Sequence, residues 1–292
     1  MKTMSNGSSK LIKSLNGHSG CQVDLIEKDS RILVSKISAN NDYNFRLRRQ
    51  TKKQTLLVPN YNVFAPKIVT QGYSDNLYYF DMEFVQGRTM AEYTNDIHIT
   101  EITDFIRCLF KCLYWDNDKV SPKAQEIFMQ KIYSLEVKLQ EYRQLNLAFQ
   151  ILKDFNWQKV FKSFCHGDLT LENILITQDK RLYLIDFLDS FYNSWQIDIA
   201  KLLQDLELKW SFRKCEISSN RALRLQVAKE ALVEEILKTN NGKEKLDTIY
   251  HILLLNIVRI YPYTKDEKTF KFLDNAVNML VEKLITKRMG VI

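Results

Sequence analysis

Apolar and polar residues alternate along the first third of the chain in the pattern of β-strands. Residues 21–26 alternate, residues 27–30 form a polar turn, and residues 31–37 alternate again, which predicts a β-hairpin. A further strand-like run over residues 78–85 is followed by Gly87. The pattern therefore predicts a small β-rich region near the start of the chain.

Beyond Gly87 the apolar residues recur every three or four positions, which is the period of an α-helix. Helices are predicted over residues 100–113, 121–145, 197–212, 219–238, 244–261 and 267–287, with one earlier helix over residues 45–57. The sequence thus predicts an α+β fold of two lobes, a β-rich lobe over residues 1–86 and a mainly helical lobe over residues 87–292. Residues 1–10 are expected to be a mobile tail.

One segment interrupts the helical period, namely residues 164–187, FCHGDLTLENILITQDKRLYLIDF. Residues 173–177 and 181–186 read as two short strands joined by a polar turn, which predicts a second hairpin. Because the two ends of an antiparallel pair meet, we expect Asn173 and Asp186 to lie close together.

Asp168, Asn173 and Asp186 are the residue types that phosphoryl transfer requires. One carboxylate orients the attacking hydroxyl and accepts its proton, while an amide and a second carboxylate hold Mg²⁺ ions on the nucleotide phosphates. The sequence therefore indicates Asp168 as the catalytic residue and Asn173 and Asp186 as metal ligands. The alternative interpretation is a chance match within an ordinary hairpin.

His-Gly-Asp at residues 166–168, Asn173, and Ile-Asp-Phe at residues 185–187 resemble the HGDxxxxN and IDF signatures of the aminoglycoside and choline phosphotransferase family. The resemblance extends over residues 16–212. It implies a protein-kinase-like fold, ATP and Mg²⁺ as cofactors, and a hydroxyl group of a small molecule as the acceptor.

The resemblance also implies that two residues support the catalytic loop. His166 would fix the loop by hydrogen bonding rather than carry protons. Asp198 stands in an Asp-x-Ala sequence and would brace the loop, and the other interpretation of Asp198 is a helix N-cap.

In the first third of the chain the resemblance implies contacts with the nucleotide phosphates. The small-residue loop 16–20 would place the backbone N–H groups of Gly17, Ser19 and Gly20 over the phosphates, although two glycines in so short a stretch also form ordinary turns. Lys36 would pair with the α and β phosphates, and its alternative reading is an exposed strand lysine.

Residues 76–87 resemble the hinge strand of the family. The backbone carbonyl of Glu83 and the backbone N–H of Val85 are the implied contacts with the adenine edge. A plain core strand is the other interpretation of the same run.

The helix predicted over residues 45–57 departs from the family pattern, because it contains no Glu or Asp. Gln50 stands where the family has a Glu that fixes the lysine, and an amide cannot neutralise Lys36. Either another carboxylate, such as Asp42, pairs with Lys36, or the phosphates alone hold it. This departure supports an alternative function, that of a nucleotide-binding pseudokinase that regulates a partner.

Three features favour a small-molecule kinase over a protein kinase. Gly167 replaces the Arg of the protein-kinase HRD motif, and Leu188 replaces the Gly of DFG. Only residues 187–197 separate Asp186 from Asp198, and no Ala-Pro-Glu follows, so a long activation segment has no room.

The acceptor is suggested by the charges and aromatic residues that follow Asp186. From Asp186 to Glu216 there are six acids and four bases, and two of the acids already have roles in the site, so the remaining balance is even. Aromatic residues at 191, 192, 195 and 210 are able to cage a quaternary cation, but such spacings are typical of core packing. A neutral or anionic acceptor, such as a sugar, a sugar phosphate or a polysaccharide precursor, is therefore favoured over choline or an aminoglycoside.

Composition and charge limit the classes of protein and the cellular location that the sequence allows. The chain has 292 residues, 45% apolar, and a formal net charge of +7. No nucleic-acid-binding motif accompanies this charge, and no apolar run reaches the length of a membrane span. The start of the chain lacks the apolar stretch of a signal peptide, and the five cysteines are scattered, so we expect a cytoplasmic protein. Neither the oligomeric state nor the choice of ATP over GTP follows from the sequence.

Overall fold

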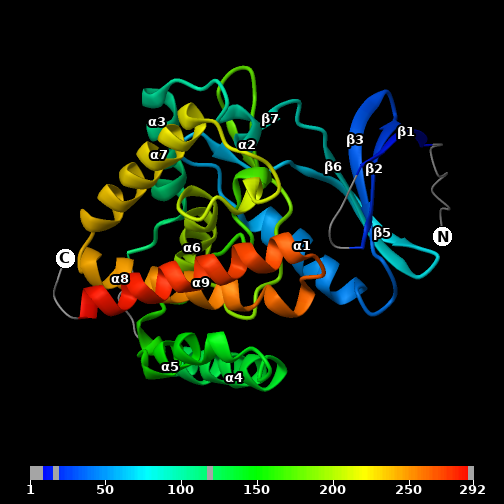
Figure 1. Cartoon of the computed structure of the whole chain (residues 1–292). Coiled ribbons are helices and arrows are strands. Elements are labelled where there is room, and N and C mark those ends of the chain that lie inside the picture. The colour runs from blue at the N-terminus through cyan, green and yellow to red at the C-terminus, as the bar shows by residue number, and fades with distance from the viewer. Residues whose placement is uncertain (1–8, 16–19, 117–120, 289–292) are drawn as a thin grey trace. The chain divides into compact units, whose positions relative to one another are not determined.

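The computed structural model describes residues 9–15, 20–116 and 121–288. The chain forms two compact units, one of residues 1–88 with 175–189, and the other of residues 89–174 with 190–292. The first is β-rich and the second is helical, so the predicted fold class is confirmed (Figure 1). The predicted single boundary after residue 86 differs from this division, because residues 175–189 group with the first unit.

The first unit is built on an antiparallel sheet with the strand order β1-β2-β3-β6-β5. Its strands are β1 (Lys10–Leu15), β2 (Gln22–Lys28), β3 (Arg31–Ile37), β6 (Leu77–Glu83) and β5 (Ile68–Ser74). The predicted hairpin is formed by β2 and β3, whose register pairs Gln22 with Ile37 and Lys28 with Arg31. The sequence pattern did not indicate β1 or β5, which are the two edge strands.

One face of this sheet carries the core of the unit and also Lys36. Val34 and Lys36 are two residues apart on β3 and so point to the same face. Val34 packs in a buried cluster with Phe80, Met82 and Leu47, the last from helix α1 (Asn44–Leu56). The position of Lys36 next to this cluster explains why only 4% of the lysine is exposed.

A second, small sheet has the order β4-β9-β8-β7. Its strands are β4 (Val63–Phe64), β9 (Leu182–Leu184), β8 (Ile174–Ile176) and β7 (Arg88–Thr89). β8 and β9 form the second predicted hairpin, closed by a hydrogen bond from the backbone N–H of Thr177 to the carbonyl of Arg181. Gly87 has to remain a glycine, because an added Cβ would lie 2.7 Å from the carbonyl oxygen of Ile176.

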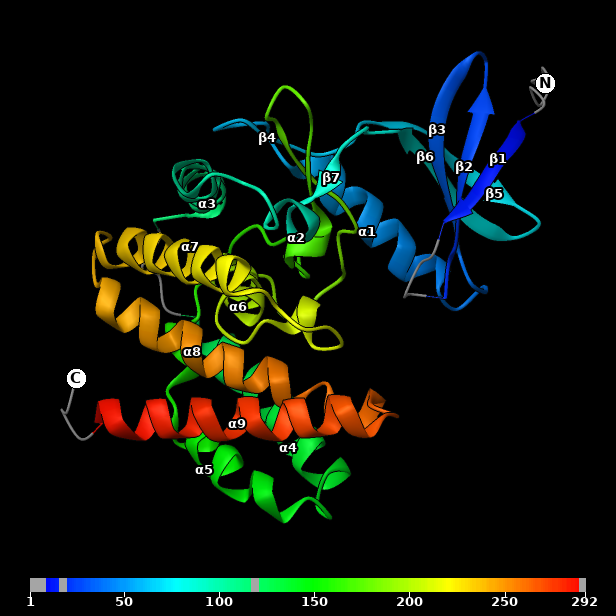
Figure 2. The same ribbon diagram turned by 45° about the horizontal axis from the view of Figure 1, so that its top comes forward.

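The second unit consists mainly of helices, with short 3₁₀ turns in some of the connections (Figure 2). Its helices are α2 (Met90–Tyr93), α3 (Ile99–Leu113), α4 (Pro122–Lys138), α5 (Asn146–Asp154), α6 (Trp195–Leu206), α7 (Ser219–Leu237), α8 (Gly242–Val258) and α9 (Glu267–Arg288). Its 3₁₀ turns are η1 (Arg143–Leu145), η2 (Trp157–Lys159), η3 (Leu171–Asn173), η4 (Trp210–Phe212) and η5 (Tyr261–Tyr263). α6 packs against α8 and is buried along nearly its whole length. None of the helices described has both the length and the apolar character to cross a membrane.

Two predicted helices are shorter in the structure than in the sequence pattern. The predicted helix 121–145 ends at Lys138, and the 3₁₀ turn η1 and helix α5 follow it. The predicted helix 197–212 ends at Leu206, and Lys209 then adopts a left-handed conformation with φ of 64°. The Asp205 carboxylate accepts hydrogen bonds from the backbone N–H and the hydroxyl of Ser211, which folds the chain back after the helix end.

Candidate active site

The loop that carries Asp168 begins with His166 and Gly167, which fix it in different ways. Gly167 has φ of 98°, a conformation open to glycine because it lacks a Cβ atom. This explains in physical terms why the position holds Gly. His166 is fully buried, and its Nδ1 accepts the backbone N–H of Asp168 at 3.2 Å. The ring therefore positions the loop, as its Nδ1 is the acceptor for a main-chain donor.

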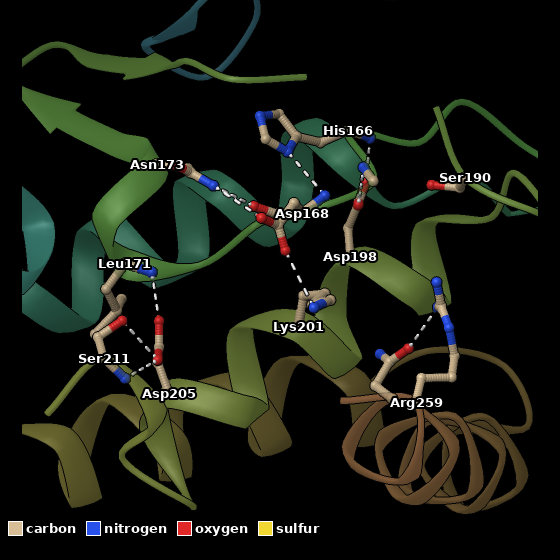
Figure 3. Close-up of polar contacts among 12 residues, drawn as sticks. His166, Asp168, Leu171, Asn173, Ser190, Asp198, Lys201, Asp205, Ser211 and Arg259 are labelled. Carbon is tan, nitrogen blue, oxygen red and sulfur yellow. Dashed lines mark hydrogen bonds and ion pairs between the residues drawn. The ribbon is translucent and has the colours of Figure 1, made fainter. Parts of the chain in front are cut away.

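Asp198, from the first turn of α6, fastens the same loop to the helix. Its fully buried carboxylate accepts the backbone N–H of His166 at 2.6 Å and that of Gly167 at 2.7 Å (Figure 3). The Cys165 thiol donates to it at 3.3 Å. The N-cap of α6 is Ser194, whose hydroxyl accepts the backbone N–H of Gln196. Asp198 therefore holds the loop that carries Asp168 and is not the N-cap of α6.

The carboxylate of Asp168 is held from two sides (Figure 3). The Asn173 amide nitrogen donates to the Asp168 backbone oxygen at 2.8 Å and to its Oδ2 at 3.3 Å. On the other side the Lys201 ammonium lies 3.1 Å from Asp168 Oδ1. The Asp168 side chain is 28% exposed, so a ligand can reach it. The result is a fixed, accessible carboxylate.

Lys201 and Asp205 are functional residues that the sequence reasoning counted only as charges. Both project from α6, and Asp205 lies two turns after Asp198 on the same side of the helix. Its fully buried carboxylate accepts the backbone N–H of Leu171 at 2.6 Å, inside the loop that joins Asp168 to Asn173. The seven-residue spacing of the two aspartates was the signal that could have revealed this second attachment.

Burial raises the pKa of Asp205 to about 6, although the hydrogen bonds from Leu171 and Ser211 oppose the shift. The charge of Glu172 acts in the same direction as burial. Because protonation weakens the carboxylate as an acceptor for Leu171, we expect this attachment to be pH-sensitive.

We expect Asp205→Asn to remove a pH-dependent part of the folding stability. The pKa of Asp205 is higher in the folded protein than in the unfolded chain, so its contribution is fully present below about pH 4 and is lost as the pH rises through 6. The wild type should therefore gain up to about 3 kcal/mol relative to the variant between pH 7 and pH 4. Urea unfolding of both proteins across this range measures the difference, and a constant difference would contradict the prediction.

In the first unit, Lys36 and Asp186 form an ion pair, with Lys36 Nζ 2.9 Å from Asp186 Oδ1. The lysine side chain is buried, whereas the Asp186 side chain is 49% exposed. Asp186 has φ of 57°, a strained conformation for a residue with a side chain, and Phe187 behind it is buried. The carboxylate that pairs with Lys36 is thus Asp186, rather than Asp42, which the sequence suggested.

Gln50 does not take the role of the missing glutamate. Its amide nitrogen donates to the Tyr43 hydroxyl at 3.2 Å, and its carbonyl oxygen has no hydrogen-bond partner among the residues described. Helix α1 instead contributes cations to the segment after Asp186. Lys53 donates to the Leu188 carbonyl, and Arg49 pairs with Asp189 at 3.1 Å.

The predicted hinge lies at the end of β6. The Glu83 backbone N–H donates to the Lys67 carbonyl, and the Glu83 carboxylate accepts the Lys67 N–H, which pins this strand end. Residues 83–86 line a cavity of about 760 Å³ together with the starts of β3 and β5 and the β8–β9 turn. Lys36 and Asp186 do not line this cavity, so the proposed adenine contacts of Glu83 and Val85 stay predictions.

Gly20, the last residue of the predicted phosphate loop, has φ of 74°. The predicted contacts of Gly17 and Ser19 lie outside the described residues. Of the sequence-predicted residues, the helical unit brings together His166, Asp168 and Asn173 in one loop, which Asp198 of α6 holds by hydrogen bonds. The β-rich unit brings together Lys36 and Asp186.

The donor set suits Mg²⁺, which prefers oxygen ligands and keeps several waters. Asn173 uses its amide nitrogen on Asp168, so its carbonyl oxygen points away and can face a metal. Asp186 engages Lys36 through one oxygen, which leaves the other for a cation. No cluster of three or more acidic, His or Cys ligands occurs in the described part of the chain. Asn173 and Asp186 belong to different units, so their joint ligation stays a prediction.

Residues 44–216 match the family described as "Phosphotransferase enzyme family". In structure the chain is similar to a predicted fructosamine-3-kinase from Haemophilus somnus 129PT, with 15% identity, 95% of this chain and 92% of that chain covered, and a TM-score of 0.58. It is also similar to an aminoglycoside-3'-phosphotransferase of type VIII (18% identity, 76% and 93% covered, TM-score 0.44) and to the choline kinase LicA from Streptococcus pneumoniae (17%, 94% and 94%, 0.40). None of the curated proteins compared with the chain matches it in sequence.

Proposed function

The chain belongs to the phosphotransferase enzyme family, and on that basis we propose that it is an ATP- and Mg²⁺-dependent kinase acting on a small molecule. It transfers the γ-phosphoryl group of ATP to a hydroxyl of a sugar-like acceptor. This function agrees with the family resemblance of the motifs around Asp168 and Asp186.

The observation that carries this proposal is the fixed carboxylate of Asp168. Asn173 and Lys201 hold it from two sides, and Asp198 anchors the loop behind it. Phosphoryl transfer depends mainly on positioning, because its transition state is loose. Asp168 orients the acceptor hydroxyl and accepts its proton, and Lys201 balances the negative charge of the carboxylate.

Lys36 and Asp186 bind the nucleotide and its metal ion. The Lys36 ammonium binds phosphate oxygens, and Asp186 and Asn173 are the residues that would hold Mg²⁺. The ion, when bound, neutralises the charge that develops on the phosphate oxygens. The exposure of Asp186 supports this role, because half of its side chain can be reached by a ligand.

A small molecule is favoured over a protein as acceptor. Only residues 187–194 lie between Asp186 and the start of α6. This segment is short, and its residues Phe187 and Tyr192 are buried. Protein kinases use a longer segment here to bind a peptide. The even charge balance of this region favours a neutral or anionic acceptor, such as a sugar, a sugar phosphate or a polysaccharide precursor.

A nucleotide-binding pseudokinase is the second candidate. It is favoured by the absence of an acidic residue from α1, since Lys36 pairs instead with Asp186, the proposed metal ligand. In that interpretation the protein binds a nucleotide and catalyses no phosphoryl transfer.

We expect ADP release from ATP and Mg²⁺ to be stimulated by at least one acceptor in a panel of sugars, sugar phosphates, choline, amino acids and aminoglycosides. Asp168→Asn is the control and should abolish the stimulation. Stimulation that persists in this variant would contradict the proposed catalytic role. Thermal stabilisation by ATP without turnover on any acceptor would favour the pseudokinase.

A further inference from the structure

A lysine of α6 reaches the carboxylate of Asp168. Lys201 Nζ lies 3.1 Å from Asp168 Oδ1, while Asp168 Oδ2 accepts the Asn173 amide at 3.3 Å (Figure 3). The Lys201 side chain is 16% exposed, so it is mostly removed from water and still open to a ligand bound at Asp168. Among the residues that the structure describes, Asp168 is the ion-pair partner of Lys201. The ammonium group therefore depends on this carboxylate for its counter-charge.

The backbone of Lys201 is fixed relative to the loop that carries Asp168. Asp198, Lys201 and Asp205 follow one another at intervals of three and four residues, so they lie on one face of α6. Asp198 accepts the backbone N–H of Gly167 at 2.7 Å, and Asp205 accepts that of Leu171 at 2.6 Å. Because its backbone is held between these two attachments, Lys201 can change partner only by moving its side chain, whose four-carbon stem is flexible.

The loop itself supplies no basic side chain for the transferring phosphoryl group. Residues 163–179 contain neither Lys nor Arg. Lys36 of the β-rich unit is assigned to the α and β phosphates. Phosphoryl transfer is accelerated mainly by positioning and by positive charge placed where negative charge develops on the transferring oxygens. A cation beside the γ-phosphoryl group therefore has to come from another element, and α6 presents one at Asp168.

The transferring group has to come close to Lys201. A hydroxyl bound to Asp168 lies about 3 Å from a carboxylate oxygen, and the phosphorus that it attacks lies about 3–3.5 Å from the hydroxyl oxygen. The Lys201 ammonium starts 3.1 Å from the same carboxylate. A rotation of the lysine side chain is therefore enough to bring the ammonium to a phosphoryl oxygen.

The reaction removes the charge that holds Lys201 in place. The acceptor oxygen forms a bond to the γ phosphorus, the bond from this phosphorus to the bridging oxygen breaks, and ADP leaves with the electron pair. The proton of the hydroxyl passes to Asp168, whose carboxyl group becomes neutral. A mostly buried ammonium that loses its counter-ion is unfavourable, and the negative phosphoryl group beside it offers a new one.

We propose that Lys201 passes from Asp168 to the transferring phosphoryl group and stabilises the negative charge of this group in the transition state. The inference rests on the proposed kinase function and adds a catalytic residue to it. Lys201 touches the reacting group itself, in addition to balancing the charge of Asp168 before the reaction.

Steady-state ADP release with the best acceptor tests this role. Lys201→Met should lower kcat about 100-fold, the effect typical of losing one preorganised contact to the transition state. The KM values for ATP and the acceptor should stay nearly the same, because the lysine binds Asp168 until the reaction begins. An unchanged kcat, or a loss confined to the KM, would overturn the proposal.

Two further variants make the kinetic test specific. Lys201→Arg keeps the positive charge and should retain more activity than Lys201→Met. Lys243→Met makes the same change at an exposed position in the first turn of α8 and should leave kcat unaltered. If Lys243→Met lowered kcat as much as Lys201→Met, or if Lys201→Arg were no more active than Lys201→Met, the proposal would be wrong.

A binding measurement separates a direct contact from an effect through Asp168. ADP with Mg²⁺ and aluminium fluoride mimics the transferring phosphoryl group, and calorimetry gives its affinity without turnover. In Asp168→Asn, the added substitution Lys201→Met should weaken binding of this complex about tenfold or more, while the affinity for ADP alone stays the same. If Lys201→Met had no effect in Asp168→Asn, Lys201 would act only through Asp168, which contradicts the proposal.

The calorimetric measurement needs no acceptor, so it tests Lys201 separately from the kinase function. ADP release with an acceptor, but no dependence of aluminium fluoride binding on Lys201, would overturn the role of Lys201 and leave the kinase function intact. Binding that depends on Lys201, without ADP release on any acceptor, would support the contact with the phosphoryl group and overturn the kinase function.

Discussion

Asp168→Asn is expected to lower kcat about 10³-fold, the size of effect typical of losing a positioned proton acceptor. Asparagine retains an oxygen that can accept the Asn173 amide, so the loop keeps its geometry. It cannot take up the proton of the acceptor hydroxyl, and it removes the charge that attracts Lys201. The KM for ATP should change little, because Lys36 and Asp186 are the residues assigned to the nucleotide.

Steady-state ADP release with the best acceptor measures this effect. Asp154→Asn is the matched control, since the same substitution is made at an exposed position at the end of α5. A loss in kcat of less than tenfold in Asp168→Asn would show that Asp168 is not the proton acceptor. A large rise in the KM for ATP, with kcat preserved, would instead place the residue in nucleotide binding.

Asp198→Ala is expected to have the largest effect on stability. It leaves the buried N–H groups of His166 and Gly167 without acceptors, and each such loss costs about 1–3 kcal/mol, so the free energy of unfolding should fall by about 2–6 kcal/mol. Asp198→Asn keeps the volume and one acceptor oxygen and should lose less. Because the loop carries Asp168, both variants should also lose activity.

Urea unfolding gives the stability, and amide hydrogen exchange at His166 and Gly167 reports on the loop itself. Both amides should exchange much faster in Asp198→Ala, whereas Asp154→Ala serves as the exposed control. Unchanged exchange at the two amides would mean that Asp198 does not hold the loop. Activity lost with stability and exchange preserved would point to a direct role for Asp198 in the reaction.

The residues of the site that the sequence identified are those whose roles depend on local spacing. Asp168 and Asn173 lie in one short loop, and the hairpin after them follows from its alternating pattern and polar turn. The family was predicted from the same segment, and the fold class from the change from strand-like to helical periodicity along the chain. Lys201 and Asp205 were missed as site residues because their contacts join α6 to the loop, and such contacts are set by tertiary packing rather than by local pattern.

The same limit applies to the β-rich unit. β1 and β5 were missed because five of the six residues of β1 are exposed and β5 carries Gly72, so neither sequence shows the alternation of a half-buried strand. The absence of an acid in α1 was evident in the sequence, but the partner of Lys36 was not. That partner, Asp186, is distant in sequence and meets Lys36 only through the folding of the unit.

The Lys36–Asp186 ion pair has a thermodynamic consequence for ligand binding. Each residue is the counter-ion of the other, and Lys36 is too deeply buried to lose its partner without cost. Phosphate that takes Lys36 leaves Asp186 uncompensated, and a cation that takes Asp186 leaves Lys36 uncompensated. The charges of Lys36 and Asp186 both stay paired only when phosphate and the cation bind together. If the protein has the proposed function, the pair would couple nucleotide and metal affinity, so that each ligand strengthens the binding of the other.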